Sequence, residues 1–228
     1  MATVILARHG RTVANADGVL AGRSAGIRLD EVGIRQAEDA ARRLEGLPLA
    51  AAATSPLERC KDTAAILLRG TGVRARVERG LTECDYGEWT GRPMKELVKE
   101  DLWKVVQAHP AGVRFPGGEA MAEMSARAVG AVRAWDTRVT ASSGEGAVWL
   151  AVAHGDVIKS VLADALGVHL DAFQRIVVDP ASLSVVRYTP ERSYVLAMNT
   201  TAGSLAALAR QEEHPEEKLG GGAGSVAS

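Results

Sequence analysis

This sequence of 228 residues has no long apolar run. After the N-terminus the longest is residues 147–153, far short of the roughly 20 residues that a membrane-spanning helix requires. The N-terminal run stops at Arg8 with no basic segment before it, which is too short for the core of a signal peptide. We therefore expect a soluble, cytoplasmic protein that has no membrane partner.

The chain also has few cysteines and almost no net charge. Cys60 and Cys84 are the only cysteines, and their spacing is not that of metal ligands. The 27 lysines and arginines nearly balance the 28 aspartates and glutamates, so the formal charge of -1 gives no support for a nucleic-acid partner. Hydrophobic residues make up 46% of the chain and charged residues 24%, which is typical of a soluble globular protein. A chain of this length can bury a core without disulfides or metals.

Several apolar segments predict strands. Residues 3–7 and 147–153 are continuously apolar rather than alternating, which indicates strands buried on both faces of a parallel sheet. Residues 182–188 and 194–198 have the pattern of two closing strands, and we expect them to pair with each other.

Helical patterns lie between these strands. Asp30 can cap a helix whose inward face carries Ile34, Ala37, Ala41 and Leu44, at about 3.6-residue spacing. Ser55 and Pro56 can begin a second helix as its cap and first residue, with an apolar side made of Leu57, Cys60, Ala64 and Leu67. Further helices are expected over residues 95–107, 119–139 and 157–166.

The alternation of strands and helices predicts an α/β fold, a three-layer α/β/α sandwich with a mostly parallel central sheet. We expect one domain over residues 1–202, with a helical insertion at about residues 92–140. From Gly203 the composition changes to charged and glycine-rich segments, so we expect residues 203–228 to form a mobile or disordered tail.

The triplet Arg8-His9-Gly10 follows the first predicted strand directly. Open α/β sheets bind their ligands at the carboxyl ends of the strands. A histidine there can act as a neutral nucleophile, and Arg8 offers a fixed charge and planar donors to phosphate oxygens. Gly10 lets the backbone approach a ligand closely. These three residues alone would equally suit a structural histidine at a strand end.

The pattern becomes specific when further motifs are read in order. They are Arg8-His9-Gly10-Arg11-Thr12-Val13-Ala14-Asn15, Ala21-Gly22-Arg23, Ser55-Pro56-Leu57-Glu58-Arg59-Cys60, Leu81-Thr82-Glu83-Cys84-Asp85-Tyr86-Gly87-Glu88-Trp89 and Ala153-His154-Gly155-Asp156. This ordered set resembles the histidine phosphatase superfamily, in its phosphoglycerate-mutase-like branch, over about residues 3–200.

The resemblance implies a role for each matching residue. His9 would be the nucleophile, Arg8 and Arg59 would clamp the phosphoryl group, and His154 would help to hold its equatorial oxygens. Glu83 would protonate the leaving oxygen. Asn15 would contact phosphate or substrate, and the further candidates for this binding are Gly10, Gly22, Arg23 and Gly155.

The chemistry agrees with these roles. A phosphoryl group in transfer spreads charge over three oxygens, so catalysis is mostly positioning and charge stabilisation, which two arginines and a histidine supply without a metal or cofactor. Glu83 would need a raised pKa to be protonated near neutral pH. Taken singly, Arg59 could be a solvated helix charge, His154 a core histidine, and Asp85 or Glu88 could replace Glu83.

Two reactions compete, namely hydrolysis of phosphate monoesters and phosphoglycerate mutation. In mutases an arginine directly follows the acid, whereas here Cys84 does, and the insertion has no pair of adjacent arginines, only Arg114 before Phe115. We therefore favour a metal-independent phosphomonoesterase that acts on small phosphorylated metabolites. A non-catalytic phospho-ligand module is a third reading, and a dinucleotide-binding domain fails because Gly10 is not followed by the required glycines.

Other residues receive weaker predictions. Residues 86–92 and Phe115 are expected to line the substrate entrance, and Arg23, Asp85, Glu119 and Lys159 are candidate specificity contacts. His109, His169 and His214 are expected at the solvated surface. Cys60 and Cys84 follow Arg59 and Glu83 in the chain, so they are expected near the pocket, with a redox switch the less favoured reading. The sequence leaves a homodimer open.

Overall fold

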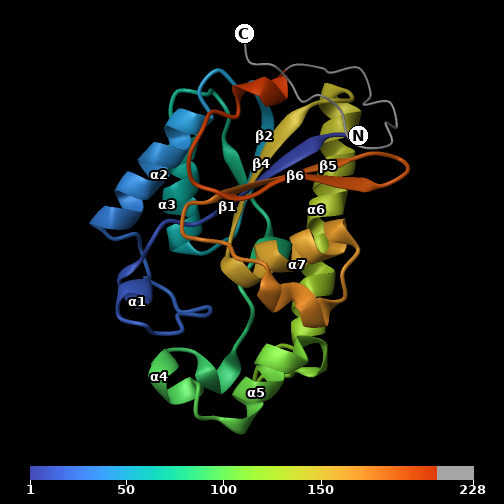
Figure 1. The fold of residues 1–228 in the computed structure, drawn as a ribbon. Helices are drawn as coiled ribbons and strands as arrows, with labels where there is room; N and C mark the ends of the chain where they lie inside the picture. Colours follow the sequence, from blue (N-terminus) through green and yellow to red (C-terminus); the bar gives the residue numbers. More distant parts are fainter. Residues whose placement is uncertain (210–228) are drawn as a thin grey trace.

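A six-stranded sheet forms the centre of the protein in the computed structural model, which describes residues 1–209 (Figure 1). The strand order is β3-β2-β4-β1-β5-β6. The strands are β1 (Thr3–Arg8), β2 (Leu49–Thr54), β3 (Ala75–Val77), β4 (Val148–Ala153), β5 (Leu183–Tyr188) and β6 (Ser193–Thr200). The pairs among β1 to β4 are parallel, and β5 pairs antiparallel with both β1 and β6. The predicted mostly parallel sheet and the pairing of the two closing strands are thereby confirmed.

Helices cover both faces of the sheet, as the continuously apolar strands predicted. α2 (Glu31–Arg43) and α3 (Glu58–Leu67) lie on one face, and α6 (Met121–Ser143) and α7 (Gly155–Leu166) lie on the other (Figure 1). Alternate residues of β1 enter different cores: Ile5 packs with the α2–α3 side and Leu6 with the α6–α7 side. This is the predicted α/β/α sandwich.

β2 and β3 were not among the predicted strands. β2 is the alanine-rich sequence Leu49–Thr54, which has little intrinsic preference for a strand. Its strand conformation comes from parallel pairing with β4 on one side and β3 on the other. Tertiary packing therefore decides this element, and propensity does not.

The helix α2 begins as predicted, but its inward face is shifted. The Asp30 carboxylate accepts from the Gly33 amide at 2.7 Å and caps the helix. Ile34, however, is 41% exposed, so its predicted inward position is wrong. The helix touches the backbone of Arg11 at Gly33, where a Cβ would lie 2.0 Å from the Arg11 carbonyl oxygen. Gly33 therefore faces inward, and Ile34, about 100° further around the helix, faces solvent.

Two other helical predictions need correction. α3 begins at Glu58 with Leu57 at its cap position and no side-chain cap, so Ser55 does not cap it. The helix predicted over residues 95–107 is two short ones, α4 (Met94–Leu97) and α5 (Asp101–Ala108). Glu100 adopts extended backbone between them, and its carboxylate accepts from Arg92.

The remaining elements are short. They are α1 (Val13–Ala16) and the 3-10 helices η1 (Arg79–Leu81), η2 (Gly87–Trp89), η3 (Pro110–Gly112), η4 (Leu170–Arg175) and η5 (Ala206–Ala209). α4 and α5 lie together beyond one end of the sheet, within the segment of about residues 92–140 that was predicted as an insertion, whose last part belongs to α6 (Figure 1). No helix within residues 1–209 is long and apolar enough to cross a membrane.

Part of the predicted tail can be followed in the structure. The Gly203 carbonyl accepts from Arg43 Nε at 2.8 Å, and the Leu205 amide donates to the Arg43 carbonyl at 2.9 Å, which ties this segment to the end of α2. The rest of the predicted tail, residues 210–228, lies outside the described residues.

Candidate active site

A cavity of about 500 Å³ opens at the carboxyl ends of the parallel strands. Three of the predicted residues line it: His9 follows β1, Arg59 lies on α3 just after β2, and Glu83 follows β3. His154, which follows β4, is fully buried and contacts Arg59 but is not part of the cavity lining. Residues far apart in the chain thus meet because parallel strands end at the same edge of the sheet. The insertion closes the opposite side of the cavity.

His9 is a buried, neutral histidine whose two ring nitrogens have different roles. Its Nδ1 lies 2.8 Å from the Gly10 carbonyl oxygen, which can only accept, so Nδ1 carries the proton. Its Nε2 accepts from Arg59 Nε at 3.2 Å. Burial, followed by the charges of Arg59 and Arg8, holds the pKa of His9 well below 6.5. At neutral pH the His9 ring is therefore neutral, and its Nε2 lone pair becomes available to a ligand in the cavity when the hydrogen bond from Arg59 Nε is exchanged.

The two arginines hold buried donors that have no partner within the described residues. Arg59 is 2% exposed, and its Nη2 donates to the Gly22 carbonyl at 2.8 Å. Arg8 Nη1 donates to the Val178 carbonyl at 2.6 Å. Arg59 Nη1 and Arg8 Nε are buried and unpaired there. An unpaired buried donor on a cation is costly, so this arrangement suits an anion that supplies the missing acceptors.

His154 is held in one orientation by two neighbours. Its Nδ1 accepts from Arg59 Nη2 at 3.2 Å, and its Nε2 therefore carries the proton that goes to Ser55 Oγ at 2.7 Å. Burial, then Arg59 and His9, keep the pKa of His154 well below its ordinary value. The rings of His9 and His154 meet edge to face, with 5.3 Å between their centroids.

Glu83 is a carboxyl group that titrates near neutral pH. Burial, and then the charge of Asp156, raises its pKa to about 7, against the lowering effect of Arg59. Its Oε1 accepts from the Cys84 amide at 3.0 Å, and its Oε2 lies 3.8 Å from His154 Nδ1. Asp85 and Glu88, which the sequence left as alternatives, do not line the cavity.

The other predicted binding residues divide into two groups. Asn15, Gly22 and Gly155 line the cavity, and the Asn15 amide oxygen accepts from Thr12, so Asn15 can offer its amide nitrogen to a ligand. Gly10 is absent from the lining. Its small size is needed elsewhere, because a Cβ there would lie 2.4 Å from the Gly33 carbonyl oxygen.

Arg23 is not brought into the cavity either. Its Nε donates to the Glu83 carbonyl at 2.9 Å, and its other nitrogens reach the carboxylates of Asp85 and Glu119. These three predicted specificity residues instead support the segment that carries Glu83. Lys159, the fourth, does line the cavity, as do Tyr86, Trp89 and Phe115.

His109, His169 and the two cysteines lie where the sequence predicted. His109 and His169 are exposed and both contact Asp171, while His214 lies outside the described residues. Cys60 and Cys84 are buried near the site. Burial raises the pKa of Cys60 to about 12 and that of Cys84 further, so both stay as thiols, which argues against a redox switch.

A family comparison decides the classification. Residues 4–201 match the family model of the histidine phosphatase superfamily, branch 1. The chain belongs to this family. The resemblance stated from the motifs is thereby confirmed, and with it membership in a superfamily of phosphatases and mutases.

Relatives of this histidine phosphatase include both kinds of protein. The chain is 33% identical over 190 residues to a probable phosphoglycerate mutase, GpmB, of Yersinia enterocolitica, covering 82% of this chain and 86% of the relative. Among solved structures it is similar to YhfR of Bacillus stearothermophilus (TM-score 0.79, 26% identity, 91% and 100% of the two chains). It is also similar to the mycobacterial glucosyl-3-phosphoglycerate phosphatase in complex with VO3 (TM-score 0.76, 25% identity, 86% and 98%).

Three residues of this histidine phosphatase were not identified as part of the site from the sequence. Ser55 orients His154, and Asp156 accepts from the Tyr86 hydroxyl at 2.7 Å and acts on Glu83 through its charge. Arg127, on α6, donates to the carbonyls of Gly80, Thr82 and Glu83. Ser55 and Asp156 stand within the quoted motifs, whereas nothing distinguishes Arg127 from a solvated helix arginine.

In the part of the chain that the structure describes, no group of three His, Cys, Asp or Glu side chains could hold a metal ion.

Proposed function

We propose that this histidine phosphatase is a phosphomonoesterase that hydrolyses small phosphorylated metabolites through a phosphohistidine on His9, with Glu83 as general acid and base. One observation carries the proposal. The neutral Nε2 of His9 faces a pocket where Arg59 Nη1 and Arg8 Nε are buried donors that lack a partner within residues 1–209. A phosphate group would supply the acceptors at the point where the nucleophile can reach phosphorus.

In the first step, His9 Nε2 attacks phosphorus, and the bond from phosphorus to the ester oxygen breaks. The protonated Glu83 gives its proton to that oxygen, so the leaving group departs as a neutral alcohol. His9 keeps the proton on Nδ1 and donates it in a hydrogen bond to the Gly10 carbonyl oxygen, which stabilises the positive charge of the phosphorylated ring. Arg8 and Arg59 neutralise the charge on the equatorial oxygens.

In the second step, the Glu83 carboxylate takes a proton from water, and the water oxygen attacks phosphorus. The phosphorus–Nε2 bond breaks, phosphate leaves, and His9 returns to its neutral form. A pKa of about 7 lets Glu83 serve in both directions near neutral pH. The side chains described above supply each proton transfer and charge contact, so the proposal includes no metal.

Hydrolysis is favoured over mutation by the cations around the cavity. A mutase must also bind the carboxylate and second phosphate of its substrate, yet the candidate cations already have anionic partners. Lys159, which lines the cavity, has its Nζ 3.7 Å from Asp156, whereas Arg92 and Arg114 are outside the lining and contact Glu100 and Glu123. The name of the Yersinia relative nevertheless keeps phosphoglycerate mutation as the second candidate. A non-catalytic module is disfavoured because His9 and Glu83 both have the protonation that catalysis needs.

The test is phosphate release by the wild type and by His9→Ala, with EDTA present, from p-nitrophenyl phosphate, alkyl phosphates and 3-phosphoglycerate. We expect release that disappears in His9→Ala and persists in His109→Ala, which alters an exposed histidine away from the cavity. Acid-labile label from ³²P-substrate should appear on the wild type alone. Interconversion of 2- and 3-phosphoglycerate without phosphate release would favour the mutase, and loss of activity in EDTA would contradict the metal-free mechanism.

A further inference from the structure

The cavity has a second half that the phosphoryl chemistry does not use. Away from His9, its walls are formed by apolar side chains of the loop after α1, the insertion and the segment after η4, including Leu20, Met94, Trp103, Val106 and Ile176. Because the phosphate end is fixed by His9 and the arginines, this half must receive the alcohol part of the ester.

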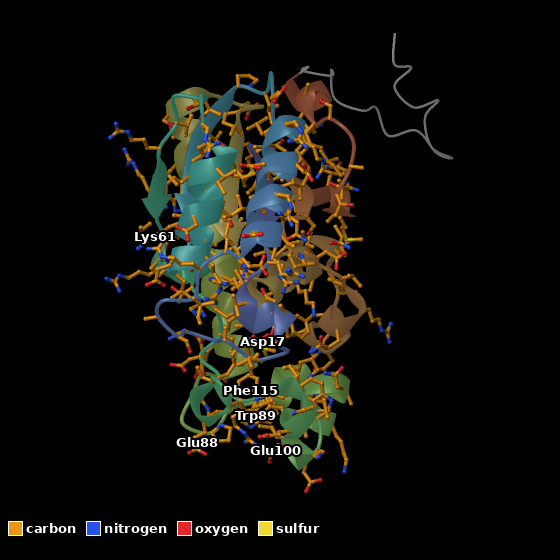
Figure 2. All side chains as sticks on the ribbon, turned by 90° about the vertical axis from the view of Figure 1, so that its left-hand side faces the viewer. Asp17, Lys61, Glu88, Trp89, Glu100 and Phe115 are labelled. Carbon is orange, nitrogen blue, oxygen red and sulfur yellow. The ribbon has the colours of Figure 1, made fainter. Side chains whose placement is uncertain are left out.

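Aromatic rings make one wall of this half rigid. Trp89 stacks on Trp103 with 6.3 Å between the ring centroids and 28° between the planes. Phe115 meets Trp89 at 5.4 Å and Tyr86 at 5.0 Å, both edge to face. Figure 2 shows Trp89, from η2, and Phe115 close together. Because these rings pack against one another, their side chains are already ordered and offer a flat apolar surface to a ligand.

The charges in this half are unfavourable for an anionic ligand. Beyond the two arginines, Lys159 is the cation among the described residues that line the cavity, and Asp156 and Asp179 line it as well. Lys159 Nζ lies 3.7 Å from Asp156 Oδ1 and donates to Gln174 Oε1 at 3.1 Å. Its charge is thus already compensated, and a carboxylate on the substrate would meet Asp156.

We infer that the alcohol part of the substrate is uncharged and carries a flat apolar or aromatic group that lies against Trp103. This inference rests on the proposed function, since it takes the alcohol half from the position of the phosphate half. A cavity of about 500 Å³ has room for a phosphate and a ring-bearing alcohol together. Trp103 is then a specificity residue. The pairing of Lys159 with Asp156 acts against substrates whose alcohol part carries a carboxylate.

The test compares two esters of similar size that differ in charge, 4-ethylphenyl phosphate and 4-(carboxymethyl)phenyl phosphate. We expect kcat/KM of the wild type to be at least about tenfold higher for the uncharged ester. Equal values, or a preference for the carboxylate, would overturn the inference. Binding of the same two esters to His9→Ala, followed by calorimetry, separates the inference from the proposed function. If no ester is hydrolysed but the uncharged one still binds about tenfold more tightly, the proposed function fails and the inference stands.

Substitutions in α5 test whether Trp103 contacts the alcohol part of the substrate. Trp103→Ala should raise KM for 4-ethylphenyl phosphate at least about fivefold and leave methyl phosphate unchanged, and Trp103→Phe should recover most of the loss. Val105→Ala, an exposed change on the same helix, is the control and should have no effect. Equal losses for both esters in Trp103→Ala would show a general structural role and would contradict the assignment of Trp103.

Discussion

The two halves of the cavity are built in different ways. The half proposed to hold the phosphate lies at the ends of four parallel strands, where Arg59 donates hydrogen bonds to both His9 and His154 and all three residues are almost completely buried. The alcohol half is made by short helices and loops, and Trp103 there is only partly buried. We therefore expect substitutions at the strand ends to lower the activity toward every substrate by a similar factor. Substitutions in the insertion should lower the activity toward some substrates more than toward others.

The largest effect that separates the halves is expected for Arg59→Ala. Removing the guanidinium takes away donors to His9, His154 and the phosphoryl oxygens, so kcat/KM should fall by about 100- to 1,000-fold. The loss should be the same for methyl and 4-ethylphenyl phosphate, measured by phosphate release. Lys61→Ala, on the exposed side of the same helix, should be neutral. An Arg59 defect that depends on the alcohol would break the division between the halves.

Glu83→Gln should come next and should depend on the leaving group. Alkyl phosphates need a proton on the departing oxygen and should slow by about 100-fold or more, while p-nitrophenyl phosphate should slow much less. Wild-type turnover of alkyl esters should also fall as the pH rises above about 7, because the acid form of Glu83 is lost there. Equal losses for both classes of ester would remove Glu83 from the leaving-group step.

The same carboxyl group should make stability depend on pH. Its folded-state pKa is raised from 4.5 to about 7, so the stability present at low pH is lost as the pH rises through that value. The free energy of unfolding of Glu83→Gln, measured by denaturant titration, should therefore exceed that of the wild type by about 1–3 kcal/mol at pH 8. At pH 4 the two proteins should have similar free energies of unfolding. A variant that is less stable at both pH values would contradict a neutralised, buried carboxyl.

Ser55→Ala sharpens the comparison within the phosphate half. Without the 2.7 Å bond, His154 loses the partner that holds its Nε2 proton, and kcat should fall by about 5- to 10-fold with little change in KM. Ser182→Ala is the matched control, since the Ser182 hydroxyl is equally buried but has no partner within residues 1–209. Equal effects of the two variants would mean that Ser55 contributes only packing.

These differences also explain how far the sequence could be interpreted. His9, Arg59 and His154 were predictable because each stands in a short motif at the end of a strand or the start of a helix. Ser55 was assigned to a helix cap, since Ser-Pro has a plausible local role, but its true partner lies 99 residues away in the chain. β2 was missed because its alanines have no strand preference.

The alcohol half was only partly predictable for the same reason. Tyr86, Trp89 and Phe115 were expected at the entrance because they stand in or near motifs, whereas Trp103 and Ile176 come from segments with no motif. Arg23 was expected at the substrate and instead supports Glu83, because charge alone does not tell which way an arginine points. Long-range packing decided each of these cases.

Lys159→Met should have the smallest effect and tests the charge argument most finely. Methionine keeps most of the apolar stem, and the lysine charge is already compensated by Asp156, so KM for 4-ethylphenyl phosphate should change less than about threefold. The charge of Asp156 would then act on Glu83 with less compensation, which should move the alkaline limb of the pH–rate profile up by a few tenths of a unit. A large loss confined to 4-(carboxymethyl)phenyl phosphate would instead show that Lys159 binds a substrate anion, and the two halves of the cavity would then both recognise charge.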